Sequence, residues 1–210
     1  KLGIAWKYDN IHENQIEWYR SSIKSLNDYN RSVLAKGGNN KADKKAAKDE
    51  TVKSLLFFHI PLREYADAWK EFSQNGYKDT ENVKYIEGCA GEKEETVYCG
   101  VGEDDLFETV CELGSTKAIF CGHDHLNNFS LNYKGIDLIY GNSIDYLAYI
   151  GIPKQGSQRG CTVITIASDG SYKIEKNNLY SGKYELPEGF SDKVSFQFDE
   201  EAFAYSHLSD

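Results

Sequence analysis

The segment TKAIFCGHDH, residues 116–125, places two histidines directly after a short and largely apolar run. The run from Thr116 to Cys121 is typical of a strand that is buried on both faces of a sheet. Gly122 permits a sharp exit from such a strand, so the segment predicts His123 and His125 at the strand's end. An imidazole costs free energy to bury without partners, and two imidazoles directed at one point indicate a bound cation.

A third histidine repeats this arrangement earlier in the chain. The run 52–58 predicts another buried strand, and His59 follows it directly, before Ile60 and Pro61. Pro61 cannot donate to a strand ladder, so the chain is expected to leave the sheet at this point. Ligands bind at the strand-end rim of open α/β sheets, and we therefore predict that His59, His123 and His125 are metal ligands there. The alternative is that these histidines belong to turns or to the core.

Length and composition limit the possible classes of protein. The chain has 210 residues, 40% of them hydrophobic, which suits one large domain. Its net charge of −9 argues against binding to a nucleic-acid backbone. No apolar run approaches the length of a transmembrane segment. A small phosphorylated substrate is compatible with this charge if a metal supplies the positive charge. The sequence begins at Lys1 and contains no methionine, so we expect further residues upstream.

The remaining patterns predict an α/β fold that ends in mixed or antiparallel sheet. Ile16, Tyr19, Ile23 and Leu26 have helical spacing from Asn14 onward, with Asp9 or Asn10 as candidate caps. Further helices are predicted over 62–72 and 104–113, the second ended by Gly114. Strands are predicted over 129–133, 136–140, 161–167 and 172–176, with turns at Lys134-Gly135 and Asp169-Gly170.

The domain organisation is predicted from composition. Residues 1–180 are expected to form the main domain, interrupted by a surface excursion at about 35–50 that is rich in glycine, asparagine, alanine and lysine. Residues 181–210 carry two lysines against seven carboxylates and are expected to form an acidic appendage.

Two cysteines lie in the polar, glycine-rich stretch from Gly88 to Gly102. Cys89 and Cys99 either close a small loop as a disulfide or remain thiols, and a disulfide would favour an extracytoplasmic location. The other three cysteines lie in apolar segments and are expected to act as small buried hydrophobic residues.

The two histidine motifs resemble those of a known family. Gly122-His123-Asp124-His125 is similar to the closing G-H-x-H motif of the calcineurin-like metallophosphoesterases, and His59-Ile60-Pro61-Leu62 is similar to the isolated-histidine motif of their purple-acid-phosphatase-like branch. The resemblance implies the C-terminal half of a four-layer αββα sandwich, with a mixed sheet and helices outside. It also implies two divalent or trivalent metal ions (Fe, Mn or Zn), with His59 and His123 on one ion and His125 on the other. The implied reaction is the hydrolysis of phosphate mono- or diesters by a dinuclear-metal-activated hydroxide.

The family's other motifs, D-x-H, G-D-x-x-D and G-N-H-D or G-N-H-E, are missing from this chain. The resemblance places them upstream of the isolated histidine, where the chain has only His12, which we assign to a solvent or capping contact. The catalytic residues are therefore unknown and expected in a missing N-terminal part. By itself the chain is expected to be inactive, whereas the intact protein is expected to be a phosphoesterase.

Two other functions fit the same residues. One is a mononuclear zinc hydrolase that uses His59, His123 and His125, and the other is a catalytically inactive, phosphoesterase-like interaction module. Asn127 is a candidate substrate-binding residue, with a turn contact as the alternative. The same choice between lining a cleft and packing remains open for four aromatic residues, Tyr65, Tyr140, Tyr146 and Tyr149.

Overall fold

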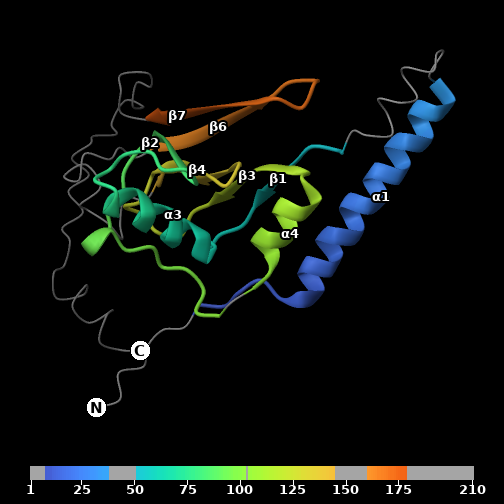
Figure 1. Cartoon of the computed structure of the whole chain (residues 1–210). Helices are drawn as coiled ribbons and strands as arrows, with labels where there is room; N and C mark the ends of the chain where they lie inside the picture. Colours follow the sequence, from blue (N-terminus) through green and yellow to red (C-terminus); the bar gives the residue numbers. More distant parts are fainter. Residues whose placement is uncertain (1–7, 38–50, 103, 145–159, 179–210) are drawn as a thin grey trace, which may run out of the picture. The chain divides into compact units, whose positions relative to one another are not determined.

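The computed structural model of the chain describes residues 8–37, 51–102, 104–144 and 160–178 (Figure 1). Several predictions concern residues that lie wholly or largely outside this described part. They are the excursion at 35–50, the appendage at 181–210, Tyr146 and Tyr149. The described elements are α1 (Glu13–Gly37), β1 (Ser54–Phe57), α3 (Arg63–Gln74), β2 (Val83–Glu87), the 3-10 turn η1 (Lys93–Glu95), α4 (Leu106–Leu113), β3 (Thr116–Cys121), β4 (Ser130–Tyr133), β5 (Ile136–Tyr140), β6 (Gly160–Ile166) and β7 (Tyr172–Asn178).

Five strands form a mixed sheet in the order β1-β3-β5-β4-β2. Strands β1, β3 and β5 are parallel, whereas β4 pairs antiparallel with both β5 and β2. The hairpin between β4 and β5 turns at Lys134 and Gly135, whose φ angles of 49° and 89° are both positive, as a type I′ turn requires. The predicted mixed sheet is confirmed.

Strand β1 differs from the prediction of burial on both faces. Among the described residues it pairs only with β3, so it lies at an edge. Phe57 is 60% exposed, although its ring stacks on that of Phe120 at a centroid distance of 4.8 Å. Strand β3, which has neighbours on both sides, comes closer to the burial that the sequence predicts for both strands, since every residue except Lys117 is buried.

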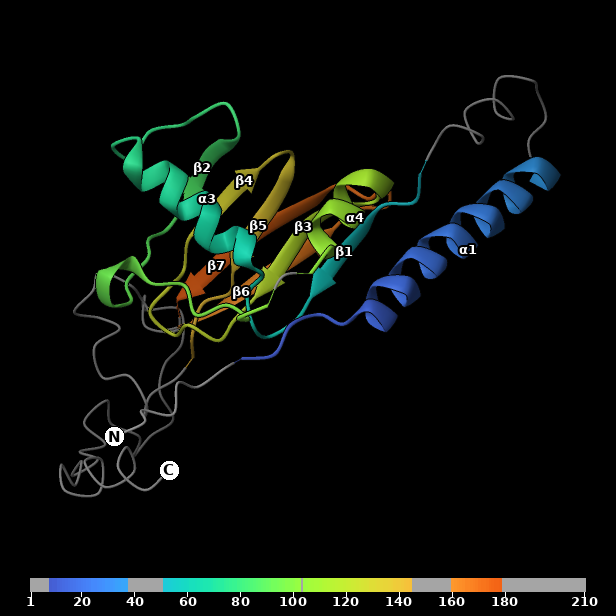
Figure 2. The same ribbon diagram turned by 60° about the horizontal axis from the view of Figure 1, so that its bottom comes forward.

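Helices cover one face of this sheet and the hairpin β6–β7 covers the other (Figures 1 and 2). On the helical side, the buried aromatic residues of α3 belong to the same core cluster as Phe129 and Tyr140. On the opposite side, Ile164, Tyr172 and Ile174 of the hairpin pack on a smaller cluster formed by Ala118, Phe120 and Ile139. The layers are thus helix, sheet and sheet, which is consistent with part of a metallophosphoesterase sandwich.

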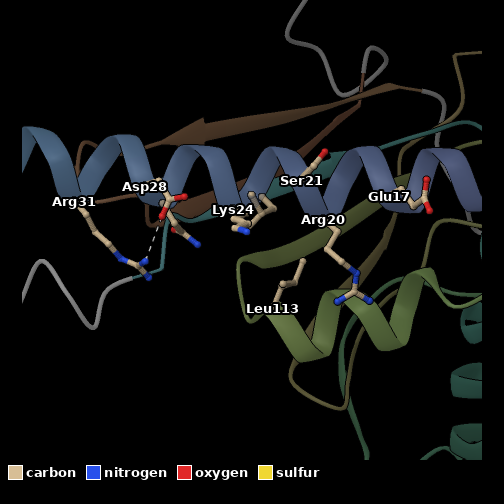
Figure 3. Close-up of a pocket in the computed structure, with 9 residues that line it drawn as sticks. Glu17, Arg20, Ser21, Lys24, Asp28, Arg31 and Leu113 are labelled. Atoms are coloured by element: carbon tan, nitrogen blue, oxygen red, sulfur yellow. Dashed lines mark hydrogen bonds and ion pairs between the residues drawn. The ribbon is translucent and has the colours of Figure 1, made fainter.

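Helix α1 packs beside α4 and the start of β3. Its Tyr19 hydroxyl shares a 2.7 Å hydrogen bond with the hydroxyl of Thr116. Arg20 donates to Glu112 at 2.8 Å and to Thr109 at 3.0 Å, and Figure 3 shows it reaching from α1 toward α4. Ile16, Tyr19 and Ile23 are buried as predicted, but Leu26 is 51% exposed because α4, the helix beneath, has only eight residues.

The start of α1 corrects one detail of the prediction. The predicted caps do not bind the first turn of the helix: the Asp9 carboxylate contacts the His12 ring at 2.9 Å, while the His12 amide donates to the Gln15 side chain at 2.8 Å. His12 therefore makes the local contact at a helix start that the sequence predicts for it. No helix in the described part of the chain is both long and apolar enough to cross a membrane.

Candidate functional site

His59 and His123 meet at one edge of the sheet because two neighbouring parallel strands end there. Strand β1 ends at Phe57 and β3 ends at Cys121, so each histidine lies two residues beyond its strand. The backbone continues the pairing past the strands, since the Gly122 amide donates to the His59 carbonyl at 3.0 Å. As a result, His59 Nε2 and His123 Nδ1 lie 3.3 Å apart, with ring centroids 5.1 Å apart and planes at 82°. The structure thus brings together two of the three predicted ligands.

This separation agrees with two nitrogen ligands of one cation. Imidazole nitrogens lie about 2.0–2.1 Å from a tetrahedral metal, which puts two such nitrogens about 3.3 Å apart. The same separation also allows a hydrogen bond between two neutral imidazoles of suitable tautomers. His59 is exposed and His123 is half-buried, so the pair is open to ions from solvent.

The surroundings of His123 favour its neutral form, which is the form that binds a metal. Burial lowers the pKa of His123, the carboxylate of Asp124 opposes this effect, and His59 and His125 lower the pKa further. The ring of Tyr8 packs edge-on against His123 at a centroid distance of 4.4 Å. His123 also has a φ of 68°, an uncommon backbone conformation for a residue other than glycine. Residues outside β1 and β3 therefore help to fix this ring.

Asp124 holds the loop between the two histidines of the H-x-H motif. Its carboxylate is 5% exposed and its Oδ2 accepts three hydrogen bonds, from the Tyr140 hydroxyl at 2.5 Å, the Tyr98 amide at 3.1 Å and the Asn127 side chain at 3.3 Å. Burial raises the pKa of Asp124, and the bonds from Tyr140 and Tyr98 lower it again. Sequence reasoning did not identify this role, and its one local signal was the carboxylate placed between two histidines.

His125 lies on the same loop, near the side chain of Glu92. Burial raises the pKa of Glu92, while its bond from the Leu126 amide and the charge of His125 lower it. Among the described residues, no group of three or more histidine, cysteine, aspartate or glutamate side chains is arranged to hold a metal ion. The two converging imidazoles therefore fit part of a metal site, and the described part of the chain does not complete the ligand set.

Asn127 has a positioning role in the structure. It is 1% exposed, and its Oδ1 accepts from the Glu92 amide at 3.2 Å. Its Nδ2 donates to the Thr96 carbonyl at 2.9 Å as well as to Asp124. These contacts agree with the turn role that the sequence left open beside substrate binding. In this conformation Asn127 presents almost no surface to a substrate.

The other candidates for the site lie elsewhere. Tyr65 is fully buried, and its hydroxyl donates to the Ile119 carbonyl at 2.6 Å, so it belongs to the core. Tyr140 is also buried and acts through Asp124. Cys89 and Cys99 are thiols, so no disulfide supports an extracytoplasmic location. The groove drawn in Figure 3, about 470 Å³ between α1 and α4, is lined by none of the predicted site residues.

Three proteins of Arabidopsis thaliana are similar in sequence to this chain. The chain is 32% identical over 96 residues to probable inactive purple acid phosphatase 28 of Arabidopsis thaliana. The aligned residues cover 46% of this chain and 20% of that protein. It is 28% identical over 160 residues to probable inactive purple acid phosphatase 29 of the same plant, covering 76% of this chain and 33% of the relative. The identity to probable inactive purple acid phosphatase 14 is 27% over 148 residues, and this alignment covers 70% of this chain and 30% of that relative.

The chain spans a third or less of the length of these relatives. No family model matches the sequence, and no solved structure matches the fold. The similarity extends well beyond the two short histidine motifs, since two of the three alignments cover at least 70% of the chain. Over part of its length the chain is therefore similar in sequence to purple-acid-phosphatase-like proteins, as its two histidine motifs predict.

Proposed function

We propose that this chain supplies the histidine part of a metal-dependent hydrolase of phosphate mono- or diesters. The observation that carries the proposal is the convergence of His59 and His123, whose ring nitrogens lie 3.3 Å apart at the ends of adjacent parallel strands. The relationship to purple-acid-phosphatase-like proteins supports a phosphoester as the substrate. The pair His59 and His123 would hold one metal ion, and His125 would bind a second.

Bound metal ions would polarise the phosphoryl oxygens and lower the pKa of water. The chain's own residues would keep the ligands in place. Burial and the neighbouring histidines lower the pKa of His123, which favours the neutral form with an available lone pair. The buried Asp124 ties the H-x-H loop to Tyr140 on β5 and to the Tyr98 backbone, which limits the movement of both flanking histidines.

The carboxylates that two adjacent cations need would come from another part of the same protein. Two cations at short range repel each other unless a bridging carboxylate offsets their charge. Among the described residues, no carboxylate joins these histidines in a group of three or more side chains that could hold a metal ion. Since the chain spans a third or less of its relatives, the proposal assigns those ligands to residues outside this chain.

The test uses the longest natural form of the protein together with the chain alone. His59→Ala and His123→Ala are compared with His12→Ala, a histidine with an ion-pair contact at the start of α1. Metal content is measured by mass spectrometry, and turnover is measured on an aryl phosphate with Fe, Mn or Zn. We expect the first two variants to lose most of the bound metal and all turnover, whereas His12→Ala retains both. Thermal unfolding of each variant separates the loss of a ligand from the loss of the fold.

The relatives' names include the word inactive, which makes a non-catalytic module the second candidate. That function is indicated if the long form binds metal through His59 and His123 but hydrolyses no phosphoester. One tightly held zinc per chain with full activity would indicate a mononuclear hydrolase. Unchanged metal content in both His59→Ala and His123→Ala would refute the metal site itself.

A further inference from the structure

A second cavity lies between the end of α3, strand β2 and the loop that contains η1. Its volume is about 540 Å³, which is within the usual range for small-molecule sites. Four aromatic side chains line it, two buried (Trp69 and Phe72) and two half-exposed (Tyr77 and Tyr85). Two carboxylates, those of Asp79 and Glu95, also line the cavity. None of the predicted metal ligands lines this cavity.

The aromatic rings are held in place by the end of α3. Gly76 and Tyr77 donate backbone hydrogen bonds to the carbonyls of Ser73 and Phe72, at 3.0 Å each, which is a Schellman ending of the helix. Gly76 has the left-handed φ of 67° that this ending requires, Tyr77 also has a positive φ, of 57°, and the ring of Tyr77 lies edge-on to Phe72 at a centroid distance of 5.8 Å. On the other side, the rings of Phe72 and Tyr85 are almost parallel, with centroids 5.2 Å apart.

The carboxylate of Glu95 places a negative charge beside two of the aromatic side chains. One carboxylate oxygen accepts from the Trp69 indole at 3.0 Å, and the other accepts from the Tyr77 hydroxyl at 2.7 Å. Among the described residues no lysine or arginine forms an ion pair with Glu95 or Asp79. One cation, Lys78, also lines the cavity, so the local charge of the lining is net negative. The net charge of −9 on the whole chain favours cations as well.

We propose that this cavity binds a small organic cation with a quaternary ammonium group, of the choline type. Aromatic faces attract such a cation through the ring quadrupole, and the carboxylates add a long-range attraction. A primary ammonium or a guanidinium group would need several hydrogen-bond acceptors. Three of the four carboxylate oxygens here already accept one hydrogen bond, since each Glu95 oxygen has a donor and Asp79 Oδ1 accepts from the Tyr85 amide at 2.9 Å. A fully methylated cation needs no acceptor, so it matches this lining better.

The experiment titrates the chain with choline and with 3,3-dimethylbutan-1-ol, the neutral molecule of nearly the same shape. Ligand-observed NMR reports both the affinity and the upfield ring-current shift that methyl groups experience over an aromatic face. We expect saturable binding of choline, about tenfold or more tighter than that of the neutral alcohol, because only the charged ligand gains the cation–π attraction and the attraction of the carboxylates. The binding requires no metal, so it is measured in the presence of a chelator.

Three variants test the assignment of the cavity. Tyr85→Leu and Glu95→Gln should each weaken choline binding about threefold or more, since the first removes an aromatic face and the second removes a negative charge. Tyr29→Leu is the matched control, because Tyr29 is a 69% exposed tyrosine on α1 and does not line the cavity. Its choline affinity should equal that of the wild type. Equal affinity for choline and the neutral alcohol, no saturation by choline, or an unchanged affinity in both cavity variants would overturn the proposal.

Discussion

Replacing Tyr140 by phenylalanine removes one hydroxyl from beneath the H-x-H loop. The ring of Tyr140 is fully buried and packs edge-on against Tyr65 and Phe129, and phenylalanine keeps those contacts. The hydroxyl donates to Asp124 Oδ2 at 2.5 Å, and Asp124 is itself 5% exposed. The substitution therefore isolates a single hydrogen bond to a buried carboxylate.

The expected loss follows from the charge of the acceptor. Hydrogen bonds to charged groups contribute about 1.5–3 kcal/mol, so we expect Tyr140→Phe to lower the free energy of unfolding by about 2–3 kcal/mol. The control is Tyr19→Phe, which removes an equally buried hydroxyl whose 2.7 Å partner is the neutral hydroxyl of Thr116. For that neutral bond the expected loss is about 1 kcal/mol.

Urea unfolding followed by circular dichroism measures both losses, and an unchanged slope shows that each variant unfolds in the same way. A metal titration of the two variants adds a functional measurement. If Asp124 fixes the histidines, Tyr140→Phe should weaken metal binding about tenfold while Tyr19→Phe leaves it unchanged. A loss of stability in Tyr140→Phe no larger than that in Tyr19→Phe would refute the role of Asp124 as a buried, charged acceptor.

Three further substitutions have defined outcomes. The pKa of Glu64 is raised to about 7, chiefly by burial, so its ionised form destabilises the fold as pH rises from about 4.5 to 7. Glu64→Gln should then stabilise the protein at pH 8 by about 1–2 kcal/mol after allowance for solvent screening, with no gain at pH 4 in thermal melts. In Gly88→Ala the new Cβ would lie 2.2 Å from the Asn128 carbonyl oxygen, so a loss of about 3 kcal/mol or more is expected in urea. Gly114→Ala is its control, with a similar positive φ and open space, and should lose only about 1 kcal/mol. Arg20→Ala should cost less than about 1 kcal/mol because its ion pair with Glu112 is largely exposed, and a larger loss would show that the fold depends on this contact.

The strands that the sequence predicted best are those with apolar, well-paired surroundings. Residues 116–121 and 136–140 form strands with the predicted bounds, since each has a partner on both sides. Strand β2 was not predicted. Among the described strands it lies at an edge of the sheet, and its Tyr85 and Ile86 are both exposed. Its register shifts between Tyr85 and Glu87, so its side chains show no simple alternation of buried and exposed positions.

The cavity between α3 and β2 was missed for a related reason. Its aromatic residues have the helical and strand spacing of ordinary core residues. One of its two carboxylates is Glu95, which lies 18 residues after Tyr77 and also has a positive φ, of 56°. A pattern search along the chain detects periodicity within one element, whereas this cavity depends on the end of one helix and on a separate loop.

The same distinction explains what was predictable in the histidine site. The position of a histidine just beyond a strand is a local property, and parallel pairing of β1 with β3 then brings His59 to His123 without further information. The residues that hold the loop are not local to one another: Asp124 takes its donors from Tyr98, 26 residues before it, and from Tyr140, 16 residues after it. A buried carboxylate is stable only when such donors are present, so the aspartate between the two histidines implies a supporting network even though the sequence does not name its members. The middle residue of this H-x-H motif therefore has a physical function of its own, which is to attach the two flanking histidines to the core of the sheet.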